Sequence, residues 1–348
     1  MKFKAAILAE QNKPLIVDEI EAELMGGRGL GFGQVLVKVH VSGICGAQLG
    51  EIEGRKGQDF NLPHLLGHEG VGTVEAVGMA VGCVRKGDRV IMHWRKGAGL
   101  ECKPPRYRWQ NGERGSVGAG WVTTFNEYAI VSENRLTKID RDIPDHAAAL
   151  MGCAVTTGLG LINNDANLKI GQSIAVIGCG GVGLNVIQGA ALVAANPIIG
   201  VDIHAGKLEM AKAFGATHGF ESIEHVRNFV GDYGVDVVVE TTGITELIEA
   251  SYALCSKTGK VIMVGQMRFD HKASLNYLPA FAGKTMFASE GGQTNPSVDI
   301  PRYLRLYKSG RLKLDGLITH RFPLGQVNEA LDLIRAGKVG RCLLTMES

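Results

Sequence analysis

A glycine motif near the middle of the chain, residues 178–183 (Gly-Cys-Gly-Gly-Val-Gly), limits the fold most strongly. An apolar run at 173–177 precedes it, and a helical stretch from 182 to about 193 follows it. In this setting Gly178 makes a tight turn, Gly180 lets a pyrophosphate approach the backbone, and Gly183 allows the helix to pack closely on the strand. The motif predicts a dinucleotide site. The alternatives are a flavin or nucleoside site on the same fold, or a turn without a ligand.

Strands and helices continue to alternate after this motif. Apolar runs predict strands at 197–202, 235–240 and 260–265, and a helix at 207–214 ends at a glycine. Such alternation predicts a doubly wound parallel sheet over residues 154–289.

The second strand of this series ends in Asp202, 19 residues beyond Gly183. A carboxylate at this place binds the ribose hydroxyls and repels the 2′-phosphate of NADP, so we expect the cofactor to be NAD. Lys207 follows, and we expect it either near the adenosine ribose or on a solvated helix face.

The first 150 residues are predicted to be β-rich. Short alternating runs predict strands at 35–41, 70–78, 87–92 and 127–131, which together suggest a small twisted barrel. From about residue 290 the chain leaves the parallel sheet, and a helix at 299–309 and a strand at 341–346 are expected to rejoin the first domain. The predicted domains are therefore 1–153 with 290–348, and 154–289.

Composition excludes several classes of partner. The net charge is only +2, which does not favour nucleic acid or an anionic membrane as the main partner. No apolar run approaches the ~20 residues of a membrane span, and the N-terminus does not resemble a signal peptide. The chain has seven cysteines, an odd number without regular spacing. We therefore expect reduced thiols and a cytoplasmic protein.

Three potential metal ligands stand in glycine-rich contexts: Cys45, His68 and Cys153. Two thiolates and an imidazole form a soft donor set that suits zinc and leaves a fourth position open. Their spacing alone does not reveal a site, because no short Cys-x-x-Cys motif is present. The alternative is two buried apolar cysteines and a histidine satisfied in the core.

In this order, the motifs resemble those of the zinc-containing alcohol dehydrogenases in the medium-chain dehydrogenase/reductase superfamily. The resemblance runs from Gly43-Ile44-Cys45-Gly46 and Gly67-His68-Glu69-Gly70 to Gly340-Arg341. It implies a GroES-like catalytic domain built from both chain ends, with a Rossmann domain inserted. It also implies one catalytic zinc held by Cys45, His68 and Cys153, with Glu69 beside it.

The resemblance also implies the cofactor and substrate contacts. Thr157 and Val182 would flank the nicotinamide, Trp94 would line the substrate pocket, and Arg341 would approach the cofactor phosphates. Gly181 and Val264 complete the cofactor residues.

The chain departs from the family pattern in the segment after the Gly87-Asp88 turn. Many relatives carry a four-cysteine zinc lobe there, whereas residues 94–120 contain only Cys102, so we expect no structural zinc. Residues 95–114 are instead basic, with Tyr107 and Trp109 interleaved. This segment is either a solvated or subunit-contacting loop, or it recognises an anionic substrate such as a phosphorylated or nucleotide-linked sugar.

A second departure follows Cys45. Relatives commonly have a Ser or Thr two residues later, as the hydroxyl that relays the alcohol proton, and then an Asp. Here Ala47 and Gln48 occupy these positions, so the usual relay is broken. Water, Glu51, His64 or a substrate hydroxyl are the alternatives.

We expect an oxidoreductase that converts a secondary alcohol of a sugar, polyol or cyclitol to a ketone, or the reverse, and that forms a homodimer or homotetramer. One rival is a zinc-free enone or quinone reductase of the same superfamily. Another is a non-catalytic NAD-binding redox sensor.

Overall fold

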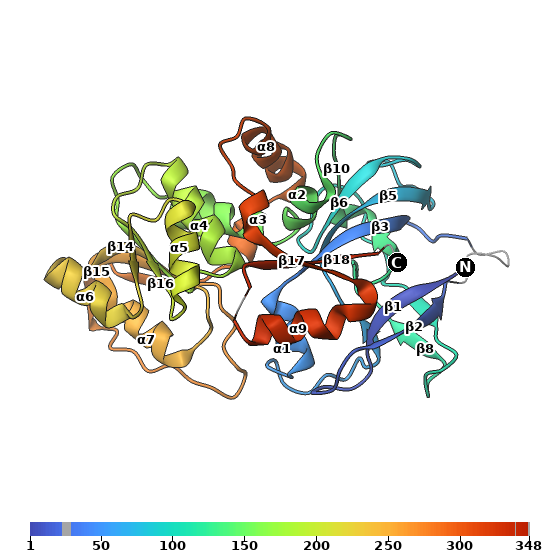
Figure 1. The fold of residues 1–348 in the computed structure, drawn as a ribbon, viewed down its shortest axis with the longest axis horizontal. Coiled ribbons are helices and arrows are strands. Elements are labelled where there is room, and N and C mark those ends of the chain that lie inside the picture. Colours follow the sequence, from blue (N-terminus) through green and yellow to red (C-terminus); the bar gives the residue numbers. More distant parts are fainter. Residues whose placement is uncertain (23–28, 338, 347–348) are drawn as a thin grey trace. The chain divides into compact units, whose positions relative to one another are not determined.

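The computed structural model describes residues 1–22, 29–337 and 339–346 and divides the chain into two compact units (Figure 1). Unit 1 comprises Met1–Cys153, Asn295–Arg305 and Leu314–Ser348, and unit 2 comprises Ala154–Thr294 and Leu306–Lys313. Each unit has its own sheets and hydrophobic core. Within the described ranges, no helix combines the length and apolar character needed to cross a membrane.

Unit 1 contains a closed barrel and a second, larger sheet, and Figure 1 labels several strands of each. The barrel order is β1 (Lys2–Leu8), β2 (Ile16–Glu21), β7 (Arg106–Arg108), β8 (Ser116–Gly118) and β4 (His64–Leu65). The larger sheet has the order β10 (Leu136–Lys138), β6 (Arg89–His93), β5 (Glu69–Val77), β3 (Gln34–Ile44), β18 (Arg341–Thr345) and β17 (Ile318–Pro323), with β9 (Tyr128–Ser132) paired to β3.

The β-rich prediction for this unit is confirmed, but the four predicted strands do not close the barrel. They form β3, β5, β6 and β9 of the larger sheet. Three strands of the barrel, β4, β7 and β8, are only two or three residues long. Such short strands show no period-2 pattern in a sequence, which is why they were not predicted.

Strand β3 is the centre of unit 1, because it pairs with β5, β9 and β18. Its alternate residues Val35, Val37 and Val39 are buried in the main apolar cluster. Gly72 on β5 lies so close to β3 that a Cβ there would be 2.3 Å from the Lys38 carbonyl oxygen. Glycine therefore permits this pairing, and β3 ends where Cys45 begins the next helix.

The basic segment forms part of the barrel. Tyr107 and Trp109 are buried, and the Tyr107 hydroxyl accepts a hydrogen bond from the Ile130 backbone N–H at 2.9 Å. The Trp109 indole N–H donates to Asp18 at 2.7 Å. The aromatic side chains that suggested a sugar or base face are thus core residues, and this part of the anionic-substrate interpretation is wrong.

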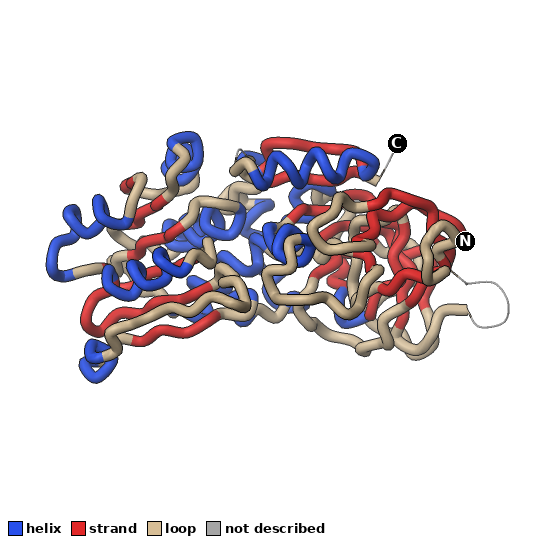
Figure 2. The backbone as a smooth tube through the Cα atoms, turned by 90° about the horizontal axis from the view of Figure 1, so that it is seen from below, coloured by secondary structure: helices blue, strands red, loops and turns tan. Residues whose placement is uncertain are grey.

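Unit 2 is a six-stranded parallel sheet with the order β13 (His218–Phe220), β12 (Ile198–Val201), β11 (Ile174–Ile177), β14 (Val235–Glu240), β15 (Cys255–Met263) and β16 (Thr285–Ala288). Every strand pair is parallel, which confirms the predicted doubly wound sheet. Figure 2 shows these strands among the helices of the unit. Helix α4 (Gly181–Leu192) packs on β11 and β12, α5 (Ala205–Ala213) packs on β12 and β13, and α7 (Thr245–Leu254) packs on β14 and β15. Unit 2 also contains α3 (Ala154–Gly160) and α6 (Ile223–Val230).

The C-terminal part of the chain contributes to both units. Helix α8 spans Pro296–Lys308, near the predicted 299–309, and β18 pairs with β3 in unit 1. The unit boundary lies at residue 295 rather than 290, and 306–313 belong to unit 2. One reason is local: Lys313 donates its backbone N–H to the Gln188 side chain at 3.1 Å. Unit 1 also contains α1 (Gly46–Ile52), α2 (Asp145–Leu150) and α9 (Val327–Arg335).

Candidate functional site

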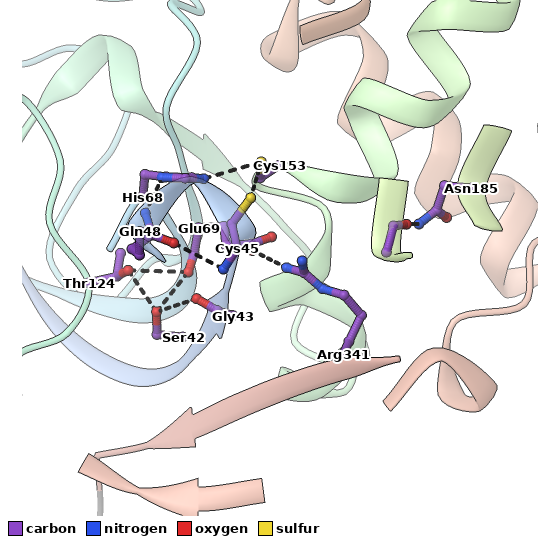
Figure 3. A network of polar contacts seen from close by, with 11 residues as sticks. Ser42, Gly43, Cys45, Gln48, His68, Glu69, Thr124, Cys153, Asn185 and Arg341 are labelled. Carbon is purple, nitrogen blue, oxygen red and sulfur yellow. Dashed lines mark hydrogen bonds and ion pairs between the residues drawn. The ribbon is translucent and has the colours of Figure 1, made fainter. Parts of the chain in front are cut away.

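Cys45, His68 and Cys153 come from three separate segments of unit 1 and meet around Glu69 (Figure 3). Cys45 follows β3 and is the N-cap of α1, His68 precedes β5, and Cys153 lies just beyond α2. Flanking glycines allow the approach. A Cβ on Gly43 would lie 2.7 Å from the Glu69 carboxyl carbon, and one on Gly152 would lie 2.9 Å from the Glu69 Cα.

The donor atoms have the spacing of a zinc centre. One ligand atom from each of Cys45, His68, Glu69 and Cys153 lies within 4.8 Å of all the others. The two sulfurs are 3.9 Å apart, and Nε2 of His68 is 3.2 Å from the Cys153 sulfur. Tetrahedral zinc, with bonds of about 2.3 Å to sulfur and 2.0 Å to nitrogen, requires about 3.8 and 3.5 Å. The spacing of the donor atoms therefore fits the metal.

Cys45 and Cys153 shift each other's pKa in opposite directions. The pKa of Cys45 is well below its ordinary value because the Cys153 thiol donates a hydrogen bond to its sulfur. The same hydrogen bond raises the pKa of Cys153 well above its ordinary value. A bound cation would stabilise the thiolate form of both residues.

Glu69 is fully buried beside these ligands and forms an ion pair with the Arg341 guanidinium through Oε1. Among the residues that the structure describes, its Oε2 has no hydrogen-bond partner. Burial raises the pKa of Glu69, although the charge of Arg341 opposes this shift. A buried carboxylate oxygen without a partner is costly, and a neighbouring cation would compensate for it. The contact of Arg341 with cofactor phosphates stays a prediction.

Gln48 is a residue of this site that was named only as a departure from the family pattern. Its side-chain oxygen accepts the Cys45 backbone N–H at 3.0 Å, and its Nε2 lies 2.6 Å from Nδ1 of His68 (Figure 3). The signal was present in the sequence, because Gln three residues after an N-cap is the pattern of a capping box.

The glycine turn of unit 2 has a close backbone contact between Gly178 and Gly183 and open space at Gly180. Gly178 has a φ of +93°, and a Cβ on Gly183 would lie 1.9 Å from the Gly178 carbonyl oxygen. A Cβ on Gly180, by contrast, would meet no atom within 4 Å. This open space lies at the N-terminus of α4, where Gly180 is the N-cap. The turn therefore fits a dinucleotide pyrophosphate.

Asp202 and its neighbours extend this turn. The Asp202 carboxylate accepts the Cys179 backbone N–H at 2.9 Å, and Lys207 Nζ is 3.8 Å from the same carboxylate oxygen. Glu240 was not predicted. Its carboxylate accepts the backbone N–H groups of Thr242 and Gly243 at 2.6 and 3.1 Å and so fixes the loop after β14.

The other predicted residues occupy these elements as well. Thr157 is buried in α3, Val182 lies in the first turn of α4, and Val264 follows β15. Trp94 follows β6 in unit 1, with the Arg95 guanidinium 5.7 Å from its ring centre. Their cofactor and substrate contacts stay predictions, as does the absence of a structural zinc.

Comparisons with known proteins agree with this arrangement. The model of the alcohol dehydrogenase GroES-like domain matches residues 31–141, and that of the zinc-binding dehydrogenase domain matches 181–309. Alcohol dehydrogenase 6 of Peromyscus maniculatus is 33% identical over 373 residues, covering 99% of this chain and 98% of that protein. Alcohol dehydrogenase-like 2 of Arabidopsis thaliana is 30% identical, covering 100% and 97%. The crystal structure of benzyl alcohol dehydrogenase from Acinetobacter calcoaceticus superposes with a TM-score of 0.87 at 25% identity, covering 100% of both chains.

Proposed function

Because the chain belongs to the zinc-type medium-chain alcohol dehydrogenase family, we propose that it transfers a hydride between a secondary alcohol and NAD at one zinc centre. The observation that supports this most directly is the spacing of Cys45, His68 and Cys153, whose donor atoms match tetrahedral zinc. When bound, zinc would supply a Lewis acid that lowers the pKa of the alcohol, and NAD would accept the hydride.

The residues of the chain hold and orient these groups. Cys45, His68 and Cys153 would hold the metal, and Glu69 with Arg341 would balance charge behind it. The backbone of 178–183 would bind the pyrophosphate. The Asp202 carboxylate, held by the Cys179 N–H, would accept the ribose hydroxyls and exclude a 2′-phosphate, which favours NAD over NADP.

The alcohol proton needs an acceptor other than residue 47, which is alanine. Both ring nitrogens of His64 already contact other groups of the chain, Asp59 at 2.7 Å and the Leu65 carbonyl at 3.0 Å. Glu51 on α1 has a pKa raised by burial, which suits a general base. We therefore favour Glu51, directly or through water.

The substrate we propose is a neutral polyhydroxy compound, a sugar, polyol or cyclitol, with Trp94 against its carbon skeleton. The basic segment gives little support for a phosphorylated or nucleotide-linked one. Trp109 is buried, and Arg114 donates to the Leu62 carbonyl at 2.5 Å. Arg106 donates to the Ser116 hydroxyl at 3.1 Å.

A homodimer, or a tetramer built from dimers, is our proposal for the assembly. Strand β16 is an edge of the unit 2 sheet, and its backbone can pair across a two-fold axis. The neighbouring segment exposes Tyr277, Leu278 and Phe281. No disulfide joins the cysteines of the described residues, which supports a reducing compartment such as the cytoplasm.

Two rivals make different predictions. A zinc-free enone or quinone reductase has no use for a Cys–His–Cys donor set, and a non-catalytic NAD sensor has no use for an open metal position. The residues of the site speak against both.

The test is the metal content of the purified full chain together with NAD reduction across simple alcohols, polyols and nucleotide sugars. One zinc per chain and turnover of a polyol support the proposal, and Cys153→Ser should lose both. The control Cys83→Ser, at an exposed cysteine, should keep both. Zinc-free protein that reduces enones would favour the reductase, and NAD binding without any turnover would favour the sensor. Ethanol or hexanol turning over far faster than any sugar derivative would refute the substrate class.

A further inference from the structure

The Gln48 side chain bridges two groups that require different atoms from it. It is 1% exposed, so water does not replace either contact. The backbone N–H of Cys45 can only donate, so the atom 3.0 Å from it is the amide oxygen. The amide nitrogen consequently faces Nδ1 of His68 at 2.6 Å. An amide NH2 group can only donate, and Nδ1 must therefore accept.

This hydrogen bond determines the tautomer of His68. A neutral imidazole that accepts at Nδ1 carries its proton on Nε2. Nε2 is the nitrogen that faces the sulfur cluster, 3.2 Å from Sγ of Cys153. A histidine that binds a metal through Nε2 needs the opposite tautomer, with the proton on Nδ1 and an acceptor beside it. In this structure Gln48 places its NH2 group, a donor, beside Nδ1.

We propose that Gln48 is a positioning residue that opposes metal uptake by holding His68 in the tautomer that cannot ligate through Nε2. Binding then requires the proton to move from Nε2 to Nδ1 and the Gln48 amide to turn over. After the amide has rotated, its oxygen accepts a hydrogen bond from Nδ1 of His68. Its NH2 group then faces the Cys45 backbone N–H, which is also a donor, so the cap of α1 is lost. The single amide oxygen cannot accept from both the Cys45 N–H and Nδ1 of His68, whereas a carboxylate has two oxygens and can accept from both.

This inference rests on the proposed zinc centre, and its main readout is the zinc dissociation constant, measured by competition with a chromogenic chelator. Gln48→Glu supplies two acceptors in the same shape, so we expect zinc binding about 10- to 100-fold tighter than in the wild type. Gln58→Glu adds the same charge at an exposed position and should leave the constant unchanged.

Gln48→Met separates the mismatch from the added charge. It keeps the approximate length of the side chain and removes both polar groups. If Gln48 opposes binding, the methionine variant binds zinc at least as tightly as the wild type. If Gln48 is an ordinary supporting partner, zinc binding weakens about 10- to 100-fold, and the inference is wrong.

A second readout reports the tautomer directly. Long-range proton–nitrogen NMR of the metal-free full chain should show His68 protonated at Nε2 in the wild type and at Nδ1 in Gln48→Glu. Protonation at Nδ1 in the metal-free wild type would overturn the inference while leaving the proposed function intact. A wild-type chain that binds no zinc under any condition would refute both.

Discussion

Gly183→Ala tests whether the glycine turn and α4 are fitted to each other. The added Cβ would lie 1.9 Å from the Gly178 carbonyl oxygen and 3.3 Å from Cγ1 of Val176. The first contact is with backbone at the turn itself, so a side-chain rotation cannot relieve it, and α4 must move away from β11. Overpacking of this kind costs about 1–3 kcal/mol, and a backbone contact places this variant at about 3 kcal/mol.

Hydrogen exchange measures this cost locally, which matters because all three tryptophans lie in unit 1 and do not report on unit 2. A loss of about 3 kcal/mol predicts roughly 100-fold faster exchange in peptides from β11 and α4. The matched control is Gly180→Ala, whose Cβ meets no atom within 4 Å. It should leave exchange unchanged but weaken NAD binding at least about tenfold, because its methyl group occupies the space for the pyrophosphate. Wild-type exchange in Gly183→Ala, or wild-type NAD affinity in Gly180→Ala, would refute this reasoning.

Four further predictions concern separate parts of the chain. Tyr107→Phe leaves the Ile130 N–H without its partner and should lower the free energy of unfolding by about 1–2 kcal/mol in urea, with zinc content unchanged. Burial lowers the pKa of His93 to about 4, below the value of about 6.5 in the unfolded chain. The unfolded chain therefore binds the proton first, and stability should fall as the pH drops from 6.5 to 4, by up to about 3 kcal/mol; a His93→Gln variant with the same pH profile would contradict this. Glu51→Gln should lower kcat at least ~100-fold if Glu51 is the base, with unchanged zinc content, and a kcat near that of the wild type would exclude it. Asp202→Ala should raise kcat/KM for NADP relative to NAD, and an unaltered ratio would show that Asp202 does not select the cofactor.

The parts of the fold that the sequence predicted are those whose signals are local. The strand at 173–177, the glycine turn and the helix after it are contiguous in the sequence, and Gly178 and Gly183 each have a steric reason to be glycine. Strand β14 and the C-terminal part of β15, with Val261 and Ile262, are largely buried apolar runs of a parallel sheet, and such runs predict strands without knowledge of their partners.

The missed parts depend on partners that are distant in the chain. The indole of Trp109 donates to Asp18, 91 residues away, so the basic segment looked like a ligand surface when it is a barrel wall. Arg341 pairs with Glu69 across 272 residues, and no spacing rule predicts that contact. For both Trp109 and Arg341, the prediction used the chemistry of the side chain alone. The actual partner depends on how the fold brings distant residues together.

Gln48 shows how a local signal and a distant one can combine at one side chain. As N3 of α1 it caps the helix through Cys45, and a glutamine serves that purpose as well as a glutamate does. Position 48 also contacts His68, 20 residues away, and there glutamine and glutamate are not equivalent. Only a carboxylate can accept hydrogen bonds from both the Cys45 backbone N–H and the imidazole. Helix capping alone therefore does not explain why this position is glutamine. If zinc affinity responds to Gln48→Glu as expected, the amide sets how tightly this chain holds its metal, a property that neither the ligands nor the fold determines.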